Sequence, residues 1–269
     1  MITEVSEFLI FLFPGIKRVL IKKWYQHLAG EYTLREWTFM NYGYADLNGD
    51  LKPALHAKDE LDRYYIQLYH HVAGITDLKD KDVLEVGSGR GGGCFYMARY
   101  LKPKQLIGMD YSQNAVDLCT SLYTLPNLRF QNGDAESLPF PDHSFDVVLN
   151  IESSHCYRSV PKFIREVARV LKPGGFFSWA DLRWNSGVRE TDRIFRKSGL
   201  RLIKEEDITP NVIRALEMVH TEKLNTIQAH APKYMWKMMR EFTGVKGTKV
   251  YNAFRSRKKV YLSKALQKV

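Results

Sequence analysis

An apolar run that passes directly into glycines is the feature that most limits how this chain can fold. Residues 83–93 read V-L-E-V-G-S-G-R-G-G-G, and five of these eleven positions are glycine. A strand followed by glycines that open a helix lets the backbone approach a ligand closely, and the helix N-terminus adds a positive dipole. Gly87, Gly89 and Gly92 match the G-x-G-x-x-G spacing. That spacing also describes nicotinamide-dinucleotide enzymes, so the remaining sequence has to decide between ligands.

Downstream of this turn, short apolar runs alternate with helical stretches. Strands are expected at 82–87, 105–110, 128–132, 145–151, 175–182 and 200–205, and helices at 91–102, 112–122, 160–171 and 189–198. The stretch L-K-P-G-G from Leu171 is typical of a helix end. The run K-V-Y-L-S-K-A-L at 259–266 predicts a last strand. This alternation predicts an α/β fold, a doubly wound, seven-stranded, mostly parallel sheet of the Rossmann-like kind with helices on both faces.

The chain divides by pattern into four segments. We expect an N-terminal helical lid at 1–80, a cofactor-binding core at 81–210, a helical cover over an acceptor pocket at 211–250 and a C-terminal strand that completes the core at 251–269. Polarizable side chains suit an irregular apolar ligand. The third segment has several of them, namely Met218, Met235, Trp236, Met238 and Met239. Ordinary core packing is the alternative for these residues.

Acidic residues are predicted to gather at the carboxyl ends of these strands. Glu85 lies within the first strand, Asp110 ends the second, and Asp134 and Ala135 follow the third in G-D-A-E-S-L-P-F. Ligands of such sheets bind beyond the carboxyl ends of the strands, so these residues should line one pocket. Asp110 can accept hydrogen bonds from both ribose hydroxyls of an adenosine. An acidic pocket disfavours a pyrophosphate and favours a cationic cofactor.

Together, E-V-G-S-G-R-G, Asp110, G-D-A-E-S-L-P-F and L-K-P-G-G-F resemble the class I S-adenosylmethionine-dependent methyltransferases. The resemblance implies S-adenosyl-L-methionine as the cofactor. It implies the following cofactor contacts: Glu85, Gly87, Gly89 and Gly91 on the methionine side, Tyr69 over the methionine end, Asp110 on the ribose, Asp134 and Ala135 beside the adenine, and Tyr111 and Asn150 as further contacts.

The resemblance can be narrowed with three longer stretches. F-M-N-Y-G-Y at 39–44, F-D-V-V-L-N-I-E-S-S-H-C-Y at 145–157 and A-D-L-R at 180–183 are similar to the mycobacterial phthiotriolone and phenolphthiotriolone dimycocerosate methyltransferases. The chain is more distantly similar to natural-product sugar O-methyltransferases. Both resemblances imply O-methylation of a hydroxyl on a hydrophobic small molecule, such as a lipid, a polyketide or a terpenoid-like compound.

Two residues at strand ends are candidates for the proton chemistry of such a transfer. An alcohol must lose its proton, and a histidine oriented by a carboxylate is a good general base. His155 follows the fourth strand and Asp181 follows the fifth. The resemblance to the sugar methyltransferases implies His155 as the base and Asp181 as its partner or as an acceptor ligand. Structural hydrogen bonding is the alternative for both, and Glu152, His70 and His71 are weaker candidates.

Other functions remain open at this stage. Methylation at carbon or nitrogen, on a sterol, a quinone or an amine, needs the same cofactor site with another base arrangement. Asp181 could bind a metal, but further clustered carboxylates are missing, so no metal is predicted. A nicotinamide oxidoreductase fits poorly with Glu85 and the Asp134 loop. The net charge of +10 suggests an RNA-directed module, but no RNA-binding signature is present, so we expect no nucleic-acid partner.

The N-terminal segment bears on localisation. F-L-I-F-L-F at 8–13 is too short to span a bilayer, and its flanking charges do not fit a signal peptide. The three cysteines show no disulfide or zinc spacing, which favours a cytoplasmic protein. Residues 8–23, which end in Lys22 and Lys23, are a candidate for peripheral membrane contact, with core packing as the alternative. For partners, the sequence is also compatible with a homodimer.

Overall fold

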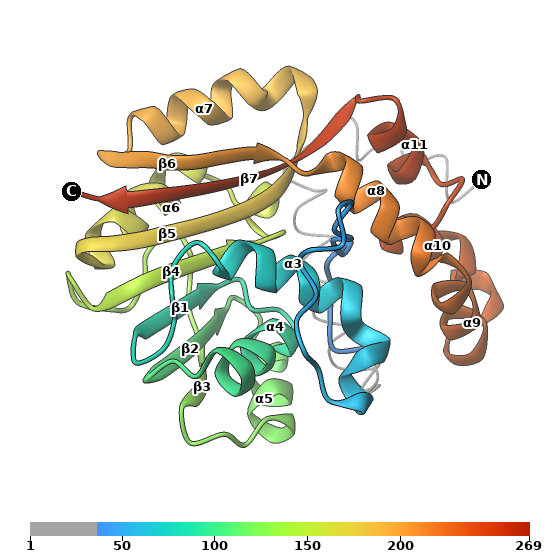
Figure 1. The fold of residues 1–269 in the computed structure, drawn as a ribbon, viewed down its shortest axis with the longest axis horizontal. Coiled ribbons are helices and arrows are strands. Elements are labelled where there is room, and N and C mark those ends of the chain that lie inside the picture. Colours follow the sequence, from blue (N-terminus) through green and yellow to red (C-terminus); the bar gives the residue numbers. More distant parts are fainter. Residues whose placement is uncertain (1–36) are drawn as a thin grey trace.

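The computed structural model describes residues 37–269, and a seven-stranded sheet lies at their centre (Figure 1). The strands are β1 (Asp82–Val86), β2 (Gln105–Asp110), β3 (Leu128–Asn132), β4 (Phe145–Ile151), β5 (Leu171–Trp184), β6 (Leu200–Asp207) and β7 (Lys259–Lys268). Their order is β3-β2-β1-β4-β5-β7-β6. β7 pairs antiparallel with β5 and β6, whereas the β1, β2, β3, β4 and β5 pairings are parallel. The predicted fold class is therefore confirmed.

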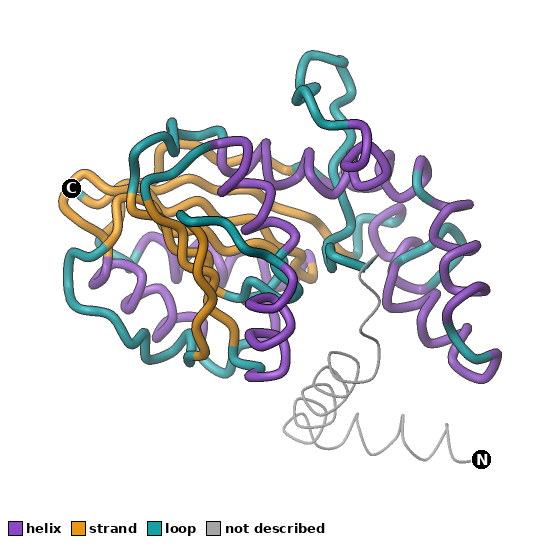
Figure 2. The backbone as a smooth tube through the Cα atoms, turned by 90° about the horizontal axis from the view of Figure 1, so that it is seen from below, coloured by secondary structure: helices purple, strands orange, loops and turns teal. Residues whose placement is uncertain are grey.

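Helices cover both faces of this sheet (Figures 1 and 2). They are α3 (Arg63–Ala73), α4 (Gly92–Tyr96), α5 (Gln113–Leu122), α6 (Val160–Val170), α7 (Val188–Arg196), α8 (Thr209–Met218), α9 (His220–His230), α10 (Trp236–Thr243) and α11 (Lys249–Arg255). α4 continues into a π-helical turn at Met97–Leu101. In Figure 1, α8 to α11 form a group beyond one end of the strands, which matches the helical insertion predicted before the last strand.

The side chains of β1 point alternately to the two faces of the sheet, and each face packs against a different set of helices. Successive side chains of a strand point to opposite faces. Val83 belongs to the core cluster that includes side chains of α3, α8 and α11, and Leu84 and Val86 belong to the cluster that includes side chains of α6 and α7. Glu85 shares the face of Val83, so its carboxyl is directed toward α3 rather than toward solvent. The same packing that forms the core therefore buries one acidic group.

Two element boundaries differ from the prediction. α6 ends at Val170, and the chain enters β5 at Leu171, so L-K-P-G-G begins a strand instead of ending a helix. The reason is a register shift, because Phe145 pairs with Leu171 whereas Val147 already pairs with Phe176. The irregular pairing accommodates the proline and the glycines. In the last segment, α11 precedes β7, so only residues from Lys259 onward form the predicted strand.

The N-terminal region is only partly helical. α3 confirms the helix predicted from the spacing of Tyr65, Leu68 and Val72, whereas residues 37–56 contain no helix. The backbone there bonds to other elements, since the Tyr44 N–H donates to the Tyr64 carbonyl and the Ala45 N–H to the Asn211 carbonyl. The apolar run at 8–13 and the candidate membrane segment at 8–23 lie outside the described residues.

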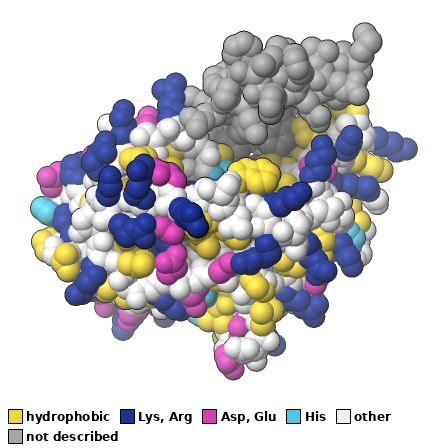
Figure 3. Space-filling view, turned by 90° about the horizontal axis from the view of Figure 1, so that it is seen from above, with side chains coloured by type: hydrophobic (Ala, Val, Ile, Leu, Met, Phe, Trp, Pro, Cys, Tyr) yellow, Lys and Arg dark blue, Asp and Glu magenta, His cyan; other side chains and the backbone are white. Residues whose placement is uncertain are grey.

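Surface charge is mixed on the face that Figure 3 displays. Lys and Arg side chains spread over much of it, with acidic side chains between them. This distribution is typical of a solvated basic surface. Within residues 37–269, no helix has the length and apolar character to span a membrane.

Candidate active site

The glycine turn after β1 is held in a conformation that favours glycine. Gly87, Gly89 and Gly91 have φ angles of +80°, +55° and +78°, which lie in the left-handed region that other residues rarely adopt. The Gly87 N–H donates to the Met109 carbonyl at 2.7 Å. A Cβ atom added to Gly87 would lie 2.0 Å from Ser153 Oγ. Backbone conformation and packing against its own neighbours therefore both require glycine in this turn.

Glu85 is a fully buried carboxyl beside this turn. The Tyr69 hydroxyl donates to Oε1 at 2.7 Å, and the Cys94 thiol donates to Oε2 at 2.8 Å. Burial raises the pKa of Glu85 to about 7, against the lowering effect of these two hydrogen bonds. A carboxyl in this state is readily ionised by a nearby cation. The structure thus brings together two of the predicted site residues, Tyr69 and Glu85.

Asp110 joins the glycine turn to the next strand. Its carboxylate accepts hydrogen bonds from the Gly89 N–H and the Ser112 N–H, each at 2.9 Å. Burial is the main influence on this group and raises the pKa of Asp110 to about 6. The Gly133 N–H donates to the Asp110 carbonyl at 3.1 Å, which places the Asp134 loop beside β2. The glycine turn, Asp110 and the Asp134 loop therefore lie next to one another, as predicted.

The remaining predicted cofactor contacts lie at the same edge. Ala135 is buried and Asp134 is exposed, with its Oδ1 accepting from the Glu136 N–H. Tyr111 is 53% exposed. The Asn150 amide at the end of β4 donates to the Val86 carbonyl at 2.8 Å. Its Oδ1 is buried and has no hydrogen-bond partner among the described residues, so the site offers an acceptor atom that a bound ligand can satisfy.

Ser153 and Tyr157 belong to this site and were missed by the sequence reasoning. The Asn150 amide also donates to the Tyr157 hydroxyl at 2.9 Å, and that hydroxyl lies 2.8 Å from Ser153 Oγ. Both side chains lie against Gly87. The signal available in the sequence was their position directly after a strand end, in the same stretch as His155. Their hydrogen bonds fix the loop between β4 and α6 onto the glycine turn.

His155 and Asp181 form a hydrogen-bonded pair. Asp181 lies within β5, which continues to Trp184, and not after the strand as predicted. His155 Nδ1 lies 2.7 Å from Asp181 Oδ1. Asp181 is fully buried, whereas the His155 side chain is 32% exposed. Since Nδ1 faces the carboxylate, Nε2 is the ring nitrogen that can take a proton from another molecule. The geometry is that of a histidine oriented by a buried acid.

Further contacts keep Asp181 ionised. The Ser154 hydroxyl and the His155 N–H donate to Oδ2 at 2.7 and 2.9 Å, and Arg183 lies 2.9 Å from the same oxygen. Burial opposes the charge, but His155, Arg183 and these hydrogen bonds outweigh it and hold the pKa of Asp181 well below its usual range. Burial likewise opposes a charged His155, but the Asp181 carboxylate dominates and raises the pKa of His155 well above its usual range.

The weaker base candidates have other contacts. Glu152 has a φ of +50°, and its Oε2 accepts from the Tyr42 N–H at 2.9 Å and from the Tyr261 hydroxyl at 3.0 Å. Burial raises the pKa of Glu152 to about 7. His70 Nδ1 lies 2.7 Å from the Tyr96 hydroxyl, and His71 stacks on Tyr44. His71 also lies 3.3 Å from Glu206 on β6, which places it in a different hollow from His155.

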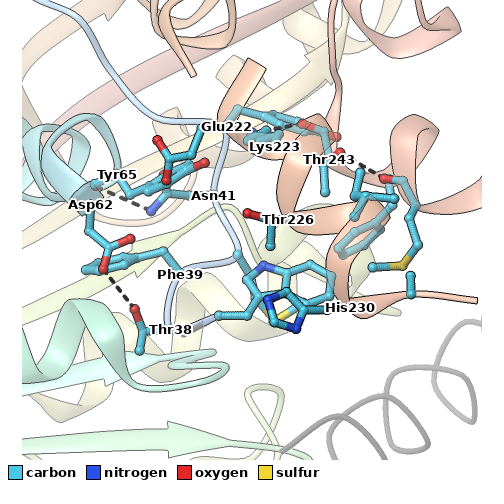
Figure 4. A pocket seen from close by; sticks show the side chains of 17 residues that line it. Thr38, Phe39, Asn41, Asp62, Tyr65, Glu222, Lys223, Thr226, His230 and Thr243 are labelled. Atoms are coloured by element: carbon cyan, nitrogen blue, oxygen red, sulfur yellow. Dashed lines mark hydrogen bonds between the residues drawn. The ribbon is translucent and has the colours of Figure 1, made fainter. Parts of the chain in front are cut away.

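A cleft lies beside this site, between the N-terminal loop and the helical cover (Figure 4). The space of the cleft is about 850 Å³ when the part that is open to solvent is counted. The lining residues are Trp37, Thr38, Phe39, Met40, Asn41, Tyr42, Asp62, Tyr65, Glu222, Lys223, Thr226, Ile227, His230, Ala231, Met239, Phe242 and Thr243. Tyr42 connects the cleft to Glu152, three residues before His155.

The predicted set of polarizable side chains contributes one residue to this cleft. Of Met218, Met235, Trp236, Met238 and Met239, only Met239 lines the cleft. Met218 and Met238 are 47% and 41% exposed, and Met235 packs in a small core with Ile227 and Met239. Helical spacing brings these residues onto different sides of short helices, so aromatic and polar residues from other elements line the cleft instead.

The sheet, the glycine turn and the two acidic strand ends define a class I methyltransferase. A methyltransferase domain model matches residues 84–179. Over 227 residues, which are 84% of each chain, the chain is 39% identical to the phthiotriol/phenolphthiotriol dimycocerosates methyltransferase of Mycobacterium tuberculosis. It therefore belongs to the family of methyltransferases that includes this mycobacterial enzyme, as the sequence motifs predicted.

A second relative and a solved structure are also similar to this chain, the latter in its fold. The chain is 42% identical over 179 residues to the fatty-acid O-methyltransferase of Mycolicibacterium smegmatis, which covers 66% of this chain and 65% of that one. The fold is similar to that of a putative sarcosine dimethylglycine methyltransferase from Galdieria sulphuraria, with a TM-score of 0.69 and 14% identity over 89% of this chain and 98% of that one.

As a member of this methyltransferase family, the chain has S-adenosylmethionine as its cofactor. The site's own chemistry fits that group, because a cationic adenosyl ligand can favour ionised Glu85 and Asp110 and can donate to the orphaned Asn150 Oδ1. Within residues 37–269, no group of three or more His, Cys, Asp or Glu side chains is arranged to hold a metal ion. The absence of a metal stays a prediction.

Proposed function

We propose that this chain transfers a methyl group to a hydroxyl oxygen of a hydrophobic, lipid-like acceptor, with His155 as the general base. The observation that carries the proposal is the 2.7 Å contact between His155 Nδ1 and the fully buried Asp181. The names of the two relatives, which concern dimycocerosates and fatty acids, support a lipid-like acceptor. The aromatic side chains of the cleft, such as Trp37, Phe39 and Tyr65, supply an apolar surface for it.

Proton removal is the part of the reaction assigned to the chain. Bound S-adenosylmethionine supplies an electrophilic methyl group on a sulfonium. His155 Nε2 accepts the proton of the acceptor hydroxyl as the new oxygen–carbon bond forms and the sulfur–carbon bond breaks. The products are a methyl ether, S-adenosylhomocysteine and a protonated His155. Asp181 holds the ring by Nδ1 and stabilises the imidazolium, so the transfer leaves no unpaired charge in the site.

The predicted cofactor contacts keep their roles in this proposal. Glu85, Gly87, Gly89, Gly91 and Tyr69 would contact the methionine part, and Asp110 would hold the ribose. Asp134 and Ala135 would flank the adenine, with Tyr111 and Asn150 nearby. The hydrogen bonds that join Tyr69 to Glu85 and Gly89 to Asp110 support one continuous site.

The N-terminal region and the helical cover would enclose the acceptor. Residues 37–42 line one wall of the cleft, and α9 and α10 line the other. This arrangement supports the predicted lid at 1–80 and the predicted cover at 211–250. Holding donor and acceptor together in a closed cleft supplies much of the rate gain expected for a methyl transfer.

A lipid-like acceptor also gives a reason for membrane contact. We propose that residues 8–23 bind anionic membrane surfaces through the apolar run at 8–13 and the basic residues Lys17, Arg18, Lys22 and Lys23. Full-length protein should float with vesicles that contain phosphatidylserine. Substitution of Lys17 and Lys22 by Glu should reduce flotation, and equal flotation with neutral vesicles would contradict the proposal.

The base assignment is tested by replacing His155 with Gln and assaying transfer to hydroxylated long-chain lipids. We expect the rate to fall by about 10²–10⁴, because the proton acceptor is lost, with little change in the Kd for S-adenosylmethionine. His56→Gln is the matched control, since His56 is exposed and its ring lies 5.6 Å from that of Tyr100 in a tilted arrangement. A His155→Gln variant within about threefold of the wild-type rate would rule out the base role.

A further inference from the structure

Lys223 is an unusual residue in the acceptor cleft. It belongs to α9, lines the cleft and is only 9% exposed. Its Nζ donates to the Thr243 carbonyl at 2.9 Å and lies 5.2 Å from the centre of the Tyr65 ring. Lysine is almost never buried to this extent without a charged partner, because burying an unpaired ammonium is unfavourable.

The described residues supply no carboxylate in direct contact with Lys223, only the more distant charges of Glu152 and Glu222. Among residues 37–269, no carboxylate oxygen forms an ion pair with Lys223 Nζ within the 4.0 Å limit that defines one. Asp62 is engaged by the Thr38 hydroxyl, and Figure 4 shows this pair at the opposite side of the pocket from Lys223 and Thr243. Burial lowers the pKa of Lys223 to about 8, with Glu152 and Glu222 opposing the shift. The side chain is therefore still mostly charged at neutral pH.

We propose that Lys223 Nζ binds a carboxylate of the methyl acceptor, which makes the preferred acceptor a hydroxylated long-chain acid. An ammonium has three donors, and the Thr243 carbonyl uses one of them. The aromatic walls of the cleft can hold the alkyl chain while the carboxylate neutralises Lys223. A single carboxylate fits better than a phosphate, because Asp62 and Glu222 also line the cleft and would repel a second negative charge.

Lys223 also has a plausible structural role. Thr243 is the last residue of α10, and a cation there satisfies a terminal carbonyl and interacts favourably with the helix dipole. A purely structural lysine would affect stability without distinguishing acids from alcohols. Comparing the binding of ligands that differ only in their head group therefore distinguishes a ligand-binding role of Lys223 from a purely structural one.

Equilibrium binding of dodecanoic acid and 1-dodecanol to the full chain measures this preference, with tryptophan fluorescence as the readout because Trp37 lines the cleft. We expect wild type to bind the acid at least about tenfold more tightly, the effect of one charge-assisted hydrogen bond. Lys223→Met should lose this preference and leave alcohol binding within about twofold. Lys237→Met, which changes an exposed lysine of α10, should behave as wild type.

Either of two results would overturn the proposal: equal binding of acid and alcohol by wild type, or an undiminished acid preference in Lys223→Met. The wild-type comparison does not depend on the variant folding, and Lys223→Arg, which keeps the charge, should retain acid preference. Carboxylate binding by Lys223 does not depend on the proposed function. Only the claim that the bound acid is methylated at its hydroxyl rests on that function. An acid preference without methyl transfer to any hydroxylated acid would contradict the proposed function and leave the Lys223 site intact.

Discussion

Asp181 combines complete burial with a dense set of donors, and this decides the chemistry available to His155. Its oxygens accept from the Ser154 hydroxyl, the His155 ring and backbone, the Leu182 N–H and Arg183. A carboxylate fixed in this way cannot easily take the proton itself. It can only orient His155 and raise its pKa. In the proposed reaction, Nε2 of His155 therefore takes the proton that the acceptor releases.

The raised pKa of His155 fixes the direction of the pH dependence. The base must be neutral to act, so the transfer rate should rise with pH through the pKa of His155. Asp181→Asn removes the charge that raises this pKa. We expect the ascending limb to move to lower pH while the plateau falls by about 10² or more, because the ring loses its orientation. A pH–rate profile of each protein measures this shift. An ascending limb at the same pH in Asp181→Asn and wild type would contradict the proposed pairing of His155 with Asp181.

At the residue scale, the sequence predicted those groups that stand alone at strand ends. Asp110 and His155 come from that rule, whereas Glu85 and Asp181 lie inside β1 and β5, near the carboxyl ends of these strands. Lys223 could not be predicted, because a lysine next to Glu222 in a helical stretch has the pattern of a solvated face. Its burial depends on contacts with other elements, namely the Thr243 carbonyl of α10 and the Tyr65 ring of α3. The same limit applies to Tyr157, whose role depends on a loop conformation.

At the scale of elements, the contact between α3 and α4 sets the position of the site. Tyr69 of α3 lies directly over Gly93 of α4 while its hydroxyl reaches Glu85 on β1. The three elements are thus joined by one aromatic side chain. The motif predicted a strand, a turn and a helix but not this third partner, because α3 precedes the motif and its spacing says nothing about which strand it covers.

Gly93→Ala tests that contact. The new Cβ would lie 1.9 Å from the Tyr69 ring, which is a fully buried clash at the site. We expect the free energy of unfolding to fall by about 1–3 kcal/mol and the Kd for S-adenosylmethionine to rise. Gly187→Ala is the matched control, because a Cβ there meets no atom within 4 Å. Urea denaturation measures the free energy of unfolding of both variants. Equal stabilities would contradict the close contact between Tyr69 and Gly93.

At the scale of the whole molecule, a basic chain carries an acidic site. Folding raises the pKa of Glu85 to about 7 and that of Asp110 to about 6, chiefly by burial. Between pH ~4 and ~7 the folded chain therefore holds protons that the unfolded chain has lost, so these groups disfavour folding increasingly as pH rises. In the proposed site, a cationic cofactor would offset this effect by stabilising the ionised carboxyls.

Cofactor affinity should consequently depend on pH. Binding of S-adenosylmethionine favours the ionised forms, so its Kd should fall by about tenfold between pH 5.5 and pH 7.5. Glu85→Gln should flatten this dependence, since one of the two titrating groups is removed. Calorimetric titration at both pH values measures the change. An unchanged Kd across this range would show that the buried carboxyls do not interact with the cofactor.

The product of the reaction tests the proposed function most directly. Purified chain is incubated with S-adenosylmethionine labelled in its methyl group and with hydroxylated long-chain lipids, and the labelled product is analysed by mass spectrometry. The proposed function predicts a methyl ether at the hydroxyl, formed by wild type and nearly absent with His155→Gln. Label on a carbon or nitrogen atom, or a methyl ether formed equally well by His155→Gln, would contradict it.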